Sequence, residues 1–313
     1  MRVPARTGTR RPRKILRKPH RIGPGAVIGI AAPASPFDRE TFDRGVQVLR
    51  DMGFEIVIPE EIAAAERYLA GPDSQRAALL QRLFEDDRID AVICARGGYG
   101  CLRILPLLDF ERIAADPKVF VGFSDVTALL AAITRRCGFA AFHGPVVTSL
   151  ADGLESTRES LLAAIASDTG AILRPAAAVT VRPGRARGVV CGGNLTTLCH
   201  LIGTPFQPSS RNRLLFLEDR GEAPYRIDRM LTQLKLAGCL EGLRGLALGS
   251  FTDCGSYEEV LGVFSERFAD ADIPILAGLP VGHAEPNLTL PVGIKAVLDA
   301  DGQTLSFDCA TEA

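Results

Sequence analysis

The segment VFVGFSDVTALLAAI, residues 119–133, joins an apolar run directly to a helical pattern. The apolar run predicts a buried strand over Lys118–Phe123, and the helical pattern predicts a helix over Asp125–Arg136 that ends before Gly138. A strand that leads straight into a helix is the repeating unit of a parallel α/β sheet. Ser124 lies at the junction between the two predicted elements.

The same alternation of strand and helix extends to both sides of this segment. The predicted strands cover 26–32, 55–58, 91–95, 118–123 and 139–142, and the predicted helices cover 37–52, 75–84 with a cap at Asp73, 125–136 and 155–167. This βαβ succession predicts an open parallel sheet with helices on both faces.

A second unit is expected in the C-terminal part of the chain. Residues 174–187 contain Pro175, Pro183, Gly184 and several alanines, which is typical of an interdomain connection. The predicted elements that follow are strands at 188–191, 214–217 and 246–251, helices at 194–202, 227–236 and 257–268, and a hairpin of 295–298 with 304–307. The predicted organisation is a basic disordered arm at 1–22, an N-terminal domain at 23–173, a linker at 174–187 and a C-terminal domain at 188–313.

Composition favours a folded enzyme or binding protein. The chain has 313 residues, of which 47% are hydrophobic, so it can build a large core. The formal net charge of −1 gives the whole protein no signature of nucleic-acid binding. Residues 1–21 are basic without any acid, which favours a disordered arm or a misassigned start over a tether to nucleic acid or anionic lipid. Residues 1–21 contain no apolar core of a signal peptide, and no run of eighteen apolar residues that could span a membrane occurs in the sequence.

The eight cysteines predict a reducing compartment and no metal site. They include no C-x-x-C pair, and several lie in or beside apolar segments. We therefore expect small buried hydrophobic side chains in a cytoplasmic protein, without zinc.

Ser124 is a candidate nucleophile because its hydroxyl would stand at the carboxyl edge of a parallel sheet. The amide of Asp125 would lie at a helix N-terminus, where free N–H groups can stabilise an oxyanion. The segment is similar to a nucleophile elbow, although Val126 stands where the G-x-S-x-G motif has glycine. The alternative is that Ser124 only caps the helix, and this segment alone leaves both interpretations open.

Two glycine-rich loops are candidates for contacts with a ligand. ICARGGYG, residues 93–100, follows a predicted strand and lacks the lysine and the spacing of nucleotide-binding loops. Several glycines together favour an amide donor or a close wall against a substrate. The same reasoning applies to CGGN, residues 191–194.

A nucleophilic serine requires a base and a carboxylate that orients the base. His143 follows a predicted strand, and His283 lies in a loop rich in glycine and proline. Local sequence does not decide between these two histidines. The carboxylate candidates are Glu218 and Asp219, at the end of the predicted strand 214–217.

Seven sequence motifs together resemble those of a known family. They are AAPASP at 31–36, ARGGYG at 95–100, GFSDVTALL at 122–130, FHGP at 142–145, GGNLTTLCHLIGTPF at 192–206, LFLEDRGEAPYRIDRML at 215–231 and GHAEPNLTLPVG at 282–293. In this order they resemble the LD-carboxypeptidase family of serine peptidases, which also includes the microcin-immunity peptidases. The resemblance runs from about Gly23 to the C-terminus.

The resemblance implies a flavodoxin-like parallel-sheet N-terminal domain and a smaller, swivelling C-terminal α/β domain. It implies a catalytic triad of Ser124, Glu218 and His283. The amides of Gly98 and Asp125 are the candidates for the oxyanion hole. Asn194 and His143 are the candidates for substrate contacts.

The implied reaction is hydrolysis of an L,D-amide that releases terminal D-alanine from murein tetrapeptides in cell-wall recycling. No cofactor, metal or nucleic acid is expected, and we expect a homodimer acting on a small peptide. One alternative is a microcin-immunity-type peptidase, but those enzymes stack a tryptophan on a nucleotide and this sequence has no tryptophan. An alternative of another class is a non-catalytic module that binds a small ligand.

Overall fold

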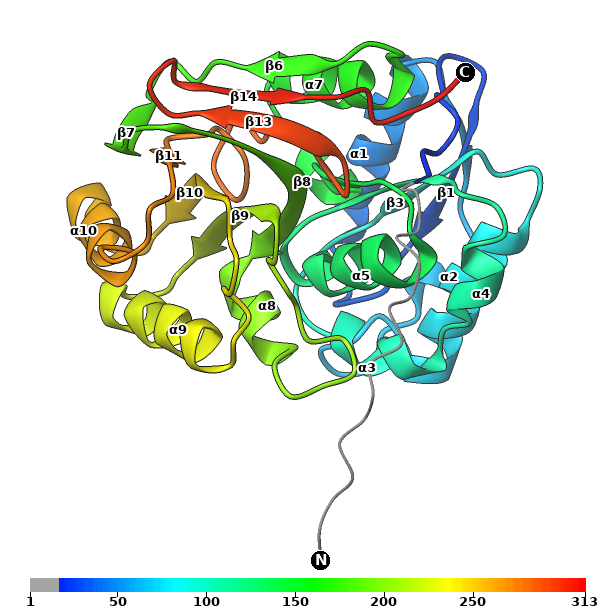
Figure 1. The fold of residues 1–313 in the computed structure, drawn as a ribbon. Helices are drawn as coiled ribbons and strands as arrows, with labels where there is room; N and C mark the ends of the chain where they lie inside the picture. Colours follow the sequence, from blue (N-terminus) through cyan, green and yellow to red (C-terminus); the bar gives the residue numbers. More distant parts are fainter. Residues whose placement is uncertain (1–16) are drawn as a thin grey trace, which may run out of the picture.

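The computed structural model describes residues 17–313, which form a mixed α/β structure with two domains built on two sheets (Figure 1). Residues 1–16, and with them most of the predicted basic arm, lie outside the described residues.

The first sheet has the strand order β12-β5-β4-β3-β1-β2. Its strands are β1 Val27–Ala31, β2 Glu55–Val57, β3 Ala91–Cys94, β4 Val119–Gly122, β5 Ala141–His143 and β12 Leu290–Val292. The first five strands are parallel and have the flavodoxin-like order 2-1-3-4-5, as predicted. In such a sheet, ligands bind beyond the carboxyl ends of the strands, where the strand order reverses; here that point lies between β1 and β3.

The helices of this first unit are α1 Arg39–Asp51, α2 Asp73–Glu85, α3 Cys101–Ile104, α4 Phe110–Ile113, α5 Thr127–Ala132, α6 Val147–Leu150 and α7 Glu155–Ala166. Helix α1 begins where Asp38 accepts a hydrogen bond from the Thr41 amide, and its buried face includes Phe42 and Leu49. Asp73 is not the cap that we predicted. It lies in the first turn of α2, and its carboxylate pairs with Arg76 and Arg103.

The second sheet has the strand order β6-β14-β13-β8-β9-β10-β11-β7. Its strands are β6 Ala171–Leu173, β7 Val179–Arg182, β8 Arg185–Asn194, β9 Arg213–Arg220, β10 Gly245–Thr252, β11 Ile275–Ala277, β13 Lys295–Asp299 and β14 Thr304–Phe307, and its helices are α8 Leu195–His200, α9 Pro224–Leu236 and α10 Tyr257–Arg267. Strands β8 to β11 are parallel, and the outer strands are antiparallel. The predicted hairpin of β13 with β14 is confirmed.

The chain passes between the two sheets more than once. Residues 174–187, which we predicted as a linker, contain β7 and the start of β8, and β6 already pairs with β14. Conversely, β12 comes from the C-terminal part of the chain but pairs with β5 of the first sheet. Sequence periodicity identifies strands without identifying their partners, which explains this difference. The division into units at 23–173 and 188–313 stays a prediction.

Residues 17–22 are held against the body of the protein, so the prediction of disorder is wrong for this part of the arm. Arg17 forms a β-bridge with Phe139, and the amide of Arg21 donates to the carbonyl of Glu312. Ile22 is buried, and its amide donates to the carbonyl of Ile165. These backbone hydrogen bonds fasten the segment although its side chains are mostly basic.

All eight cysteines lie within the described residues, and none forms a disulfide. In residues 17–313, no cluster of histidine, cysteine, aspartate and glutamate could hold a metal ion. No helix in that range is long and apolar enough to cross a membrane.

Candidate active site

Ser124 occupies a sharp turn between β4 and α5. Its φ of 61° lies in the left-handed region, which residues other than glycine rarely adopt and which is typical of functional turns. Phe123 takes the N-cap position of the short 3-10 turn at Ser124–Val126, and no side chain caps that turn. Ser124 is therefore not a capping residue, and its hydroxyl is left for another role.

The glycine loop after β3 packs directly against Ser124. A Cβ at Gly97 would lie 2.9 Å from the Cβ and 3.1 Å from the Oγ of Ser124, so only glycine allows this approach. Gly98 has a φ of +107°, and a Cβ there would collide with the side chain of Ser35. The Ser35 hydroxyl accepts from the Tyr99 amide at 3.0 Å, which joins this loop to the one after β1. The loops after β1 and β3 thus meet at the point where the strand order of the first sheet reverses.

The amides that we predicted for the oxyanion hole are those of Gly98 and Asp125. Within residues 17–313, neither amide donates to another protein group. The Asp125 carboxylate accepts from the Cys101 amide at 2.8 Å and so braces the glycine loop. Burial raises the pKa of Asp125, because it disfavours the charged form more than the neighbouring hydrogen bonds favour it.

Glu218 and His283 form a close pair. Glu218 is completely buried near the end of β9, and its Oε2 lies 2.7 Å from Nδ1 of His283. The His283 side chain is 14% exposed, so it connects the buried carboxylate to the surface. Its ring packs edge-on against Phe123 with a centroid separation of 4.9 Å. Since Phe123 precedes Ser124, this contact brings the Glu218–His283 pair beside the serine turn.

His143 approaches Glu218 from the opposite side. Its Nε2 lies 3.6 Å from Oε1 of Glu218, and the side chain is completely buried. Its ring packs edge-on against Phe123 and Phe216, at 5.9 and 5.1 Å between centroids. Neither ring nitrogen has a hydrogen-bond partner among the described residues. The structure thus places His143 against Glu218, and a contact between His143 and substrate stays a prediction.

The two histidines determine the ionisation of Glu218. Burial alone raises the pKa of the Glu218 carboxyl, but the contacts with His143 and His283 outweigh burial and hold this pKa at about 2. Glu218 is therefore ionised at neutral pH and can stabilise positive charge on an imidazole.

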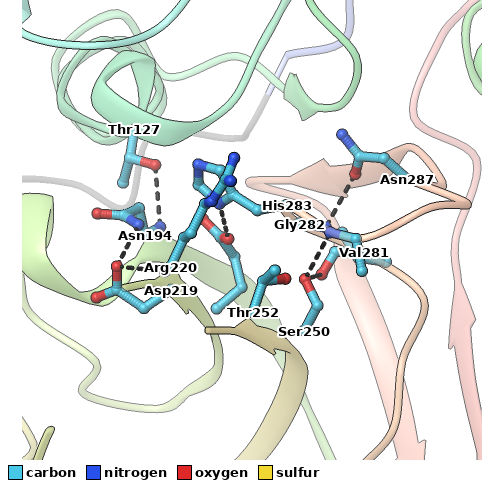
Figure 2. A network of polar contacts seen from close by, with 12 residues as sticks. Thr127, Asn194, Asp219, Arg220, Ser250, Thr252, Val281, Gly282, His283 and Asn287 are labelled. Atoms are coloured by element: carbon cyan, nitrogen blue, oxygen red, sulfur yellow. Dashed lines mark hydrogen bonds and ion pairs between the residues drawn. The ribbon is translucent and has the colours of Figure 1, made fainter. Parts of the chain in front are cut away.

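The loop that carries His283 is held by hydrogen bonds within the loop and to Ser250 of β10 (Figure 2). The Gly282 amide donates to Oδ1 of Asn287 at 2.9 Å, and the Ser250 hydroxyl lies 3.3 Å from the Val281 carbonyl. Gly282 has a φ of +127°, and a Cβ there would collide with Ser250 and Glu218. The loop therefore fits closely over the carboxylate that orients the histidine.

Asn194 lies in a network that joins the two domains (Figure 2). Its amide donates to Oγ1 of Thr127, on the helix that follows Ser124, at 3.0 Å. Its side chain caps α8 through the Thr197 amide and donates to Oδ1 of Asp219 at 2.9 Å. The side chain is thus occupied within the protein, and a direct contact between Asn194 and substrate stays a prediction.

Cysteine is a poor alternative to serine at this site. Burial raises the pKa of Cys191 to about 11 and that of Cys199 to about 12. Burial also raises the pKa of Cys94 and Cys101, which lie nearer the glycine loop. The thiolate is the reactive form of cysteine, so these thiols are inert at neutral pH.

Sequence reasoning missed three residues that shape this site, namely Ser35, Gly97 and Thr127. Gly97 was part of the glycine loop that drew attention, but its contact with Ser124 depends on the pairing of β3 with β4. Ser35 and Thr127 carried no local signal, because an isolated hydroxyl is common in loops and helices.

Comparison with known proteins identifies the family. The profile of the LD-carboxypeptidase N-terminal domain matches residues 28–144, and that of the C-terminal domain matches residues 187–298. The chain belongs to the LD-carboxypeptidase family. This LD-carboxypeptidase homologue is accordingly a serine-type carboxypeptidase, as predicted.

Several relatives match the LD-carboxypeptidase chain over nearly its full length. A putative carboxypeptidase of Streptomyces coelicolor is 42% identical, covering 94% of this chain and 96% of its own. The murein tetrapeptide carboxypeptidase of Pseudomonas aeruginosa is 36% identical, covering 88% of this chain and 93% of its own. The microcin C7 self-immunity protein of Escherichia coli is 30% identical, covering 90% of this chain and 93% of its own.

A solved structure confirms the fold of this LD-carboxypeptidase. The protein from Bacillus anthracis described as similar to the microcin immunity protein MccF superposes with a TM-score of 0.88. It is 25% identical and covers 93% of this chain and 99% of its own.

Proposed function

We propose that this protein hydrolyses an L,D-amide bond and releases the terminal D-alanine of murein tetrapeptides. The observation that carries the proposal is the hydrogen bond between the buried Glu218 and His283 beside the left-handed turn of Ser124. The name of the Pseudomonas aeruginosa relative supports murein tetrapeptide as the substrate.

In the proposed mechanism, Ser124 is the nucleophile and His283 is the general base. With Nδ1 of His283 donating to Glu218, Nε2 is the nitrogen that accepts the serine proton. Attack of Oγ on the amide carbonyl then gives a tetrahedral intermediate. The imidazolium donates its proton to the leaving amine, D-alanine departs, and water hydrolyses the acyl-enzyme by the same route.

The amides of Gly98 and Asp125 are the proposed oxyanion hole. Both are free of protein acceptors in the described part of the chain, and both flank the Ser124 turn. Such donors contribute by stabilising the charge that develops on the carbonyl oxygen. Asn194 holds the turn through Thr127, and a direct contact between Asn194 and the substrate is part of the same proposal.

His143 has the geometry of a positioning residue for Glu218. It contacts the carboxylate oxygen that His283 does not use, and it has no exposed surface. It would help to keep Glu218 ionised and in a fixed orientation while His283 exchanges protons with Ser124.

A second substrate class is the peptidyl-nucleotide amide of the microcin-immunity peptidases, which the Escherichia coli relative brings into consideration. The absence of tryptophan from the sequence disfavours a nucleotide stack of that kind. The non-catalytic alternative predicts that Ser124 is dispensable, and it gives no role to the buried Glu218–His283 pair.

Further expectations belong to the same proposal. A cytoplasmic location accords with the eight cysteines, none of which forms a disulfide. We also propose that the protein is a homodimer, that it acts on a small peptide and that it does not bind nucleic acid.

The test is incubation of the purified protein with murein tetrapeptide, followed by mass spectrometry for free D-alanine. We expect release that is insensitive to EDTA and is lost in Ser124→Ala. Persistent release by Ser124→Ala, or no release from tetrapeptide together with cleavage of a peptidyl-nucleotide amide, would reject the proposal.

A further inference from the structure

A cavity of about 220 Å³ lies between the two domains, and none of Ser124, Glu218 and His283 lines it. Its apolar wall comes from Leu130, Leu198, Leu215, Leu234, Leu240 and Val292. These residues belong to α5, α8, β9, α9, the turn after α9 and β12, so both sheets contribute. Helices α5 and α8, which face each other across the domain boundary in Figure 1, provide two of its sides.

Two arginines without acidic partners stand at this cavity. Arg135 and Arg213 both line it, and none of the described residues that line it is acidic. The guanidinium of Arg213 has no hydrogen-bond or ion-pair partner among residues 17–313, and that of Arg135 donates only to the Gln207 carbonyl. Arg211 also lines the cavity, but Glu241 neutralises it at 2.5 Å.

The positive charge at this cavity is uncompensated. The pKa of Arg135 is lowered by burial and by the charges of Arg136 and Arg213. Arg135 is exposed and Arg213 is partly buried, and an anion that approaches both guanidinium groups relieves their mutual repulsion. The cavity thus combines an apolar wall with a site for one negative charge.

We propose that this cavity binds a small monocarboxylate with a compact apolar body, whose carboxylate lies between Arg135 and Arg213. A cavity of about 150 Å³ accommodates benzene, so the volume here suits a body of about that size with a carboxylate attached. The planar guanidinium forms paired hydrogen bonds with carboxylates, which favours this head group.

Binding at this place would connect the two domains. Arg135 follows α5, the helix that begins after Ser124, whereas Arg213 begins β9, the strand that carries Glu218. A ligand held by both arginines therefore stabilises the docked arrangement of the two domains, independently of the peptidase reaction.

The experiment is isothermal titration of the full-length protein with phenylacetate, alongside thermal unfolding with the same compound. We expect saturable binding and a rise in Tm. Phenylacetamide, which has the same shape without the charge, should bind at least tenfold more weakly. Inorganic phosphate, which lacks the apolar body, should also bind more weakly than phenylacetate.

The variants test the arginines directly. Arg135→Gln with Arg213→Gln should weaken phenylacetate binding at least tenfold, whereas Arg211→Gln, which removes an already neutralised charge, should change it little. Arg213→Lys keeps the charge but lacks the planar pair of donors, so it should weaken phenylacetate binding less than Arg213→Gln does; this comparison keeps the test usable if the double variant fails to fold. The proposal is overturned if phenylacetate does not bind at millimolar concentration, or if phenylacetamide binds equally well.

Discussion

The backbone of Ser124 is strained because its φ of 61° suits glycine and not serine. We expect Ser124→Gly to be more stable than Ser124→Ala by about 1 kcal/mol, although glycine usually destabilises relative to alanine. Urea unfolding of the two variants measures this difference, and both should lack peptidase activity. A more stable alanine variant would show that the turn is relaxed in solution.

The two histidines on Glu218 should respond differently to replacement. His283→Ala should lower kcat on murein tetrapeptide by several orders of magnitude, because it removes the proposed base. His143→Phe preserves the packing against Phe123 and Phe216 but removes the contact with Glu218. It should lower kcat by a smaller factor and leave KM unchanged.

Steady-state kinetics of folded variants separates these roles of the histidines. A rise in KM for His143→Phe at constant kcat would indicate the substrate contact that the sequence suggested. A larger loss of kcat in His143→Phe than in His283→Ala would assign the base to His143.

Glu218 makes stability depend on pH in the acid range. Its pKa falls from an ordinary value of 4.5 to about 2 on folding, so the folded protein favours the ionised form. This contribution is complete above about pH 4.5 and is lost as the pH falls toward 2. The stability advantage of the natural protein over Glu218→Gln should therefore shrink between these values. An advantage that stays constant as the pH falls from above about 4.5 to about 2, measured by urea unfolding, would contradict a depressed pKa of Glu218.

At the scale of elements, one hydrogen bond links the nucleophile helix to the second sheet. Thr127 is fully buried at the start of α5, and its Oγ1 accepts from the amide of Asn194 where β8 ends. Thr127→Val leaves that buried amide without an acceptor and should cost about 1–3 kcal/mol of unfolding free energy. Peptidase activity should fall as well, because Ser124 and Glu218 lie on the two sides of this link.

Thr134→Val is the matched control for this link. The Thr134 hydroxyl donates only within its own turn, to the carbonyls of Leu130 and Ala131. Its loss should cost little, since those carbonyls belong to helical turns. Equal losses of stability in the two variants would show that the interdomain hydrogen bond has no special role.

The pairing of β12 with β5 is the second link between elements. Leu290 lies opposite His143 in this antiparallel pair, seven residues after His283 along the chain. The loop that carries the proposed base is therefore anchored on the sheet that carries the nucleophile. This arrangement limits how far the second domain can swivel without disturbing the site.

At the scale of the whole molecule, the two sheets should unfold together. Strand β12 belongs to the first sheet, whereas β13 and β14 belong to the second. The two ends of the described segment are also joined, because the Glu312 amide donates to the Pro19 carbonyl. We expect one cooperative transition, with calorimetric and van't Hoff enthalpies in agreement. Two separate transitions would instead support independent domains with the boundaries predicted from the sequence.

The local features of this protein could be predicted from its sequence. Apolar runs and helical periodicity located most of the strands and helices, because these patterns reflect which face of each element is buried. They also placed Ser124 at a strand–helix junction, and the family motifs pointed to Glu218 and His283.

Which of these groups meet depends on the folded chain and could not be predicted from local patterns. Local patterns left His143 and His283 equivalent, whereas the folded chain puts one on each side of Glu218 and buries only His143 completely. Local patterns also did not show that β12 belongs to the first sheet or that two arginines at the interdomain cavity lack acidic partners. Strand partners, burial and charge compensation arise from contacts between residues far apart in the chain, and no local pattern records them.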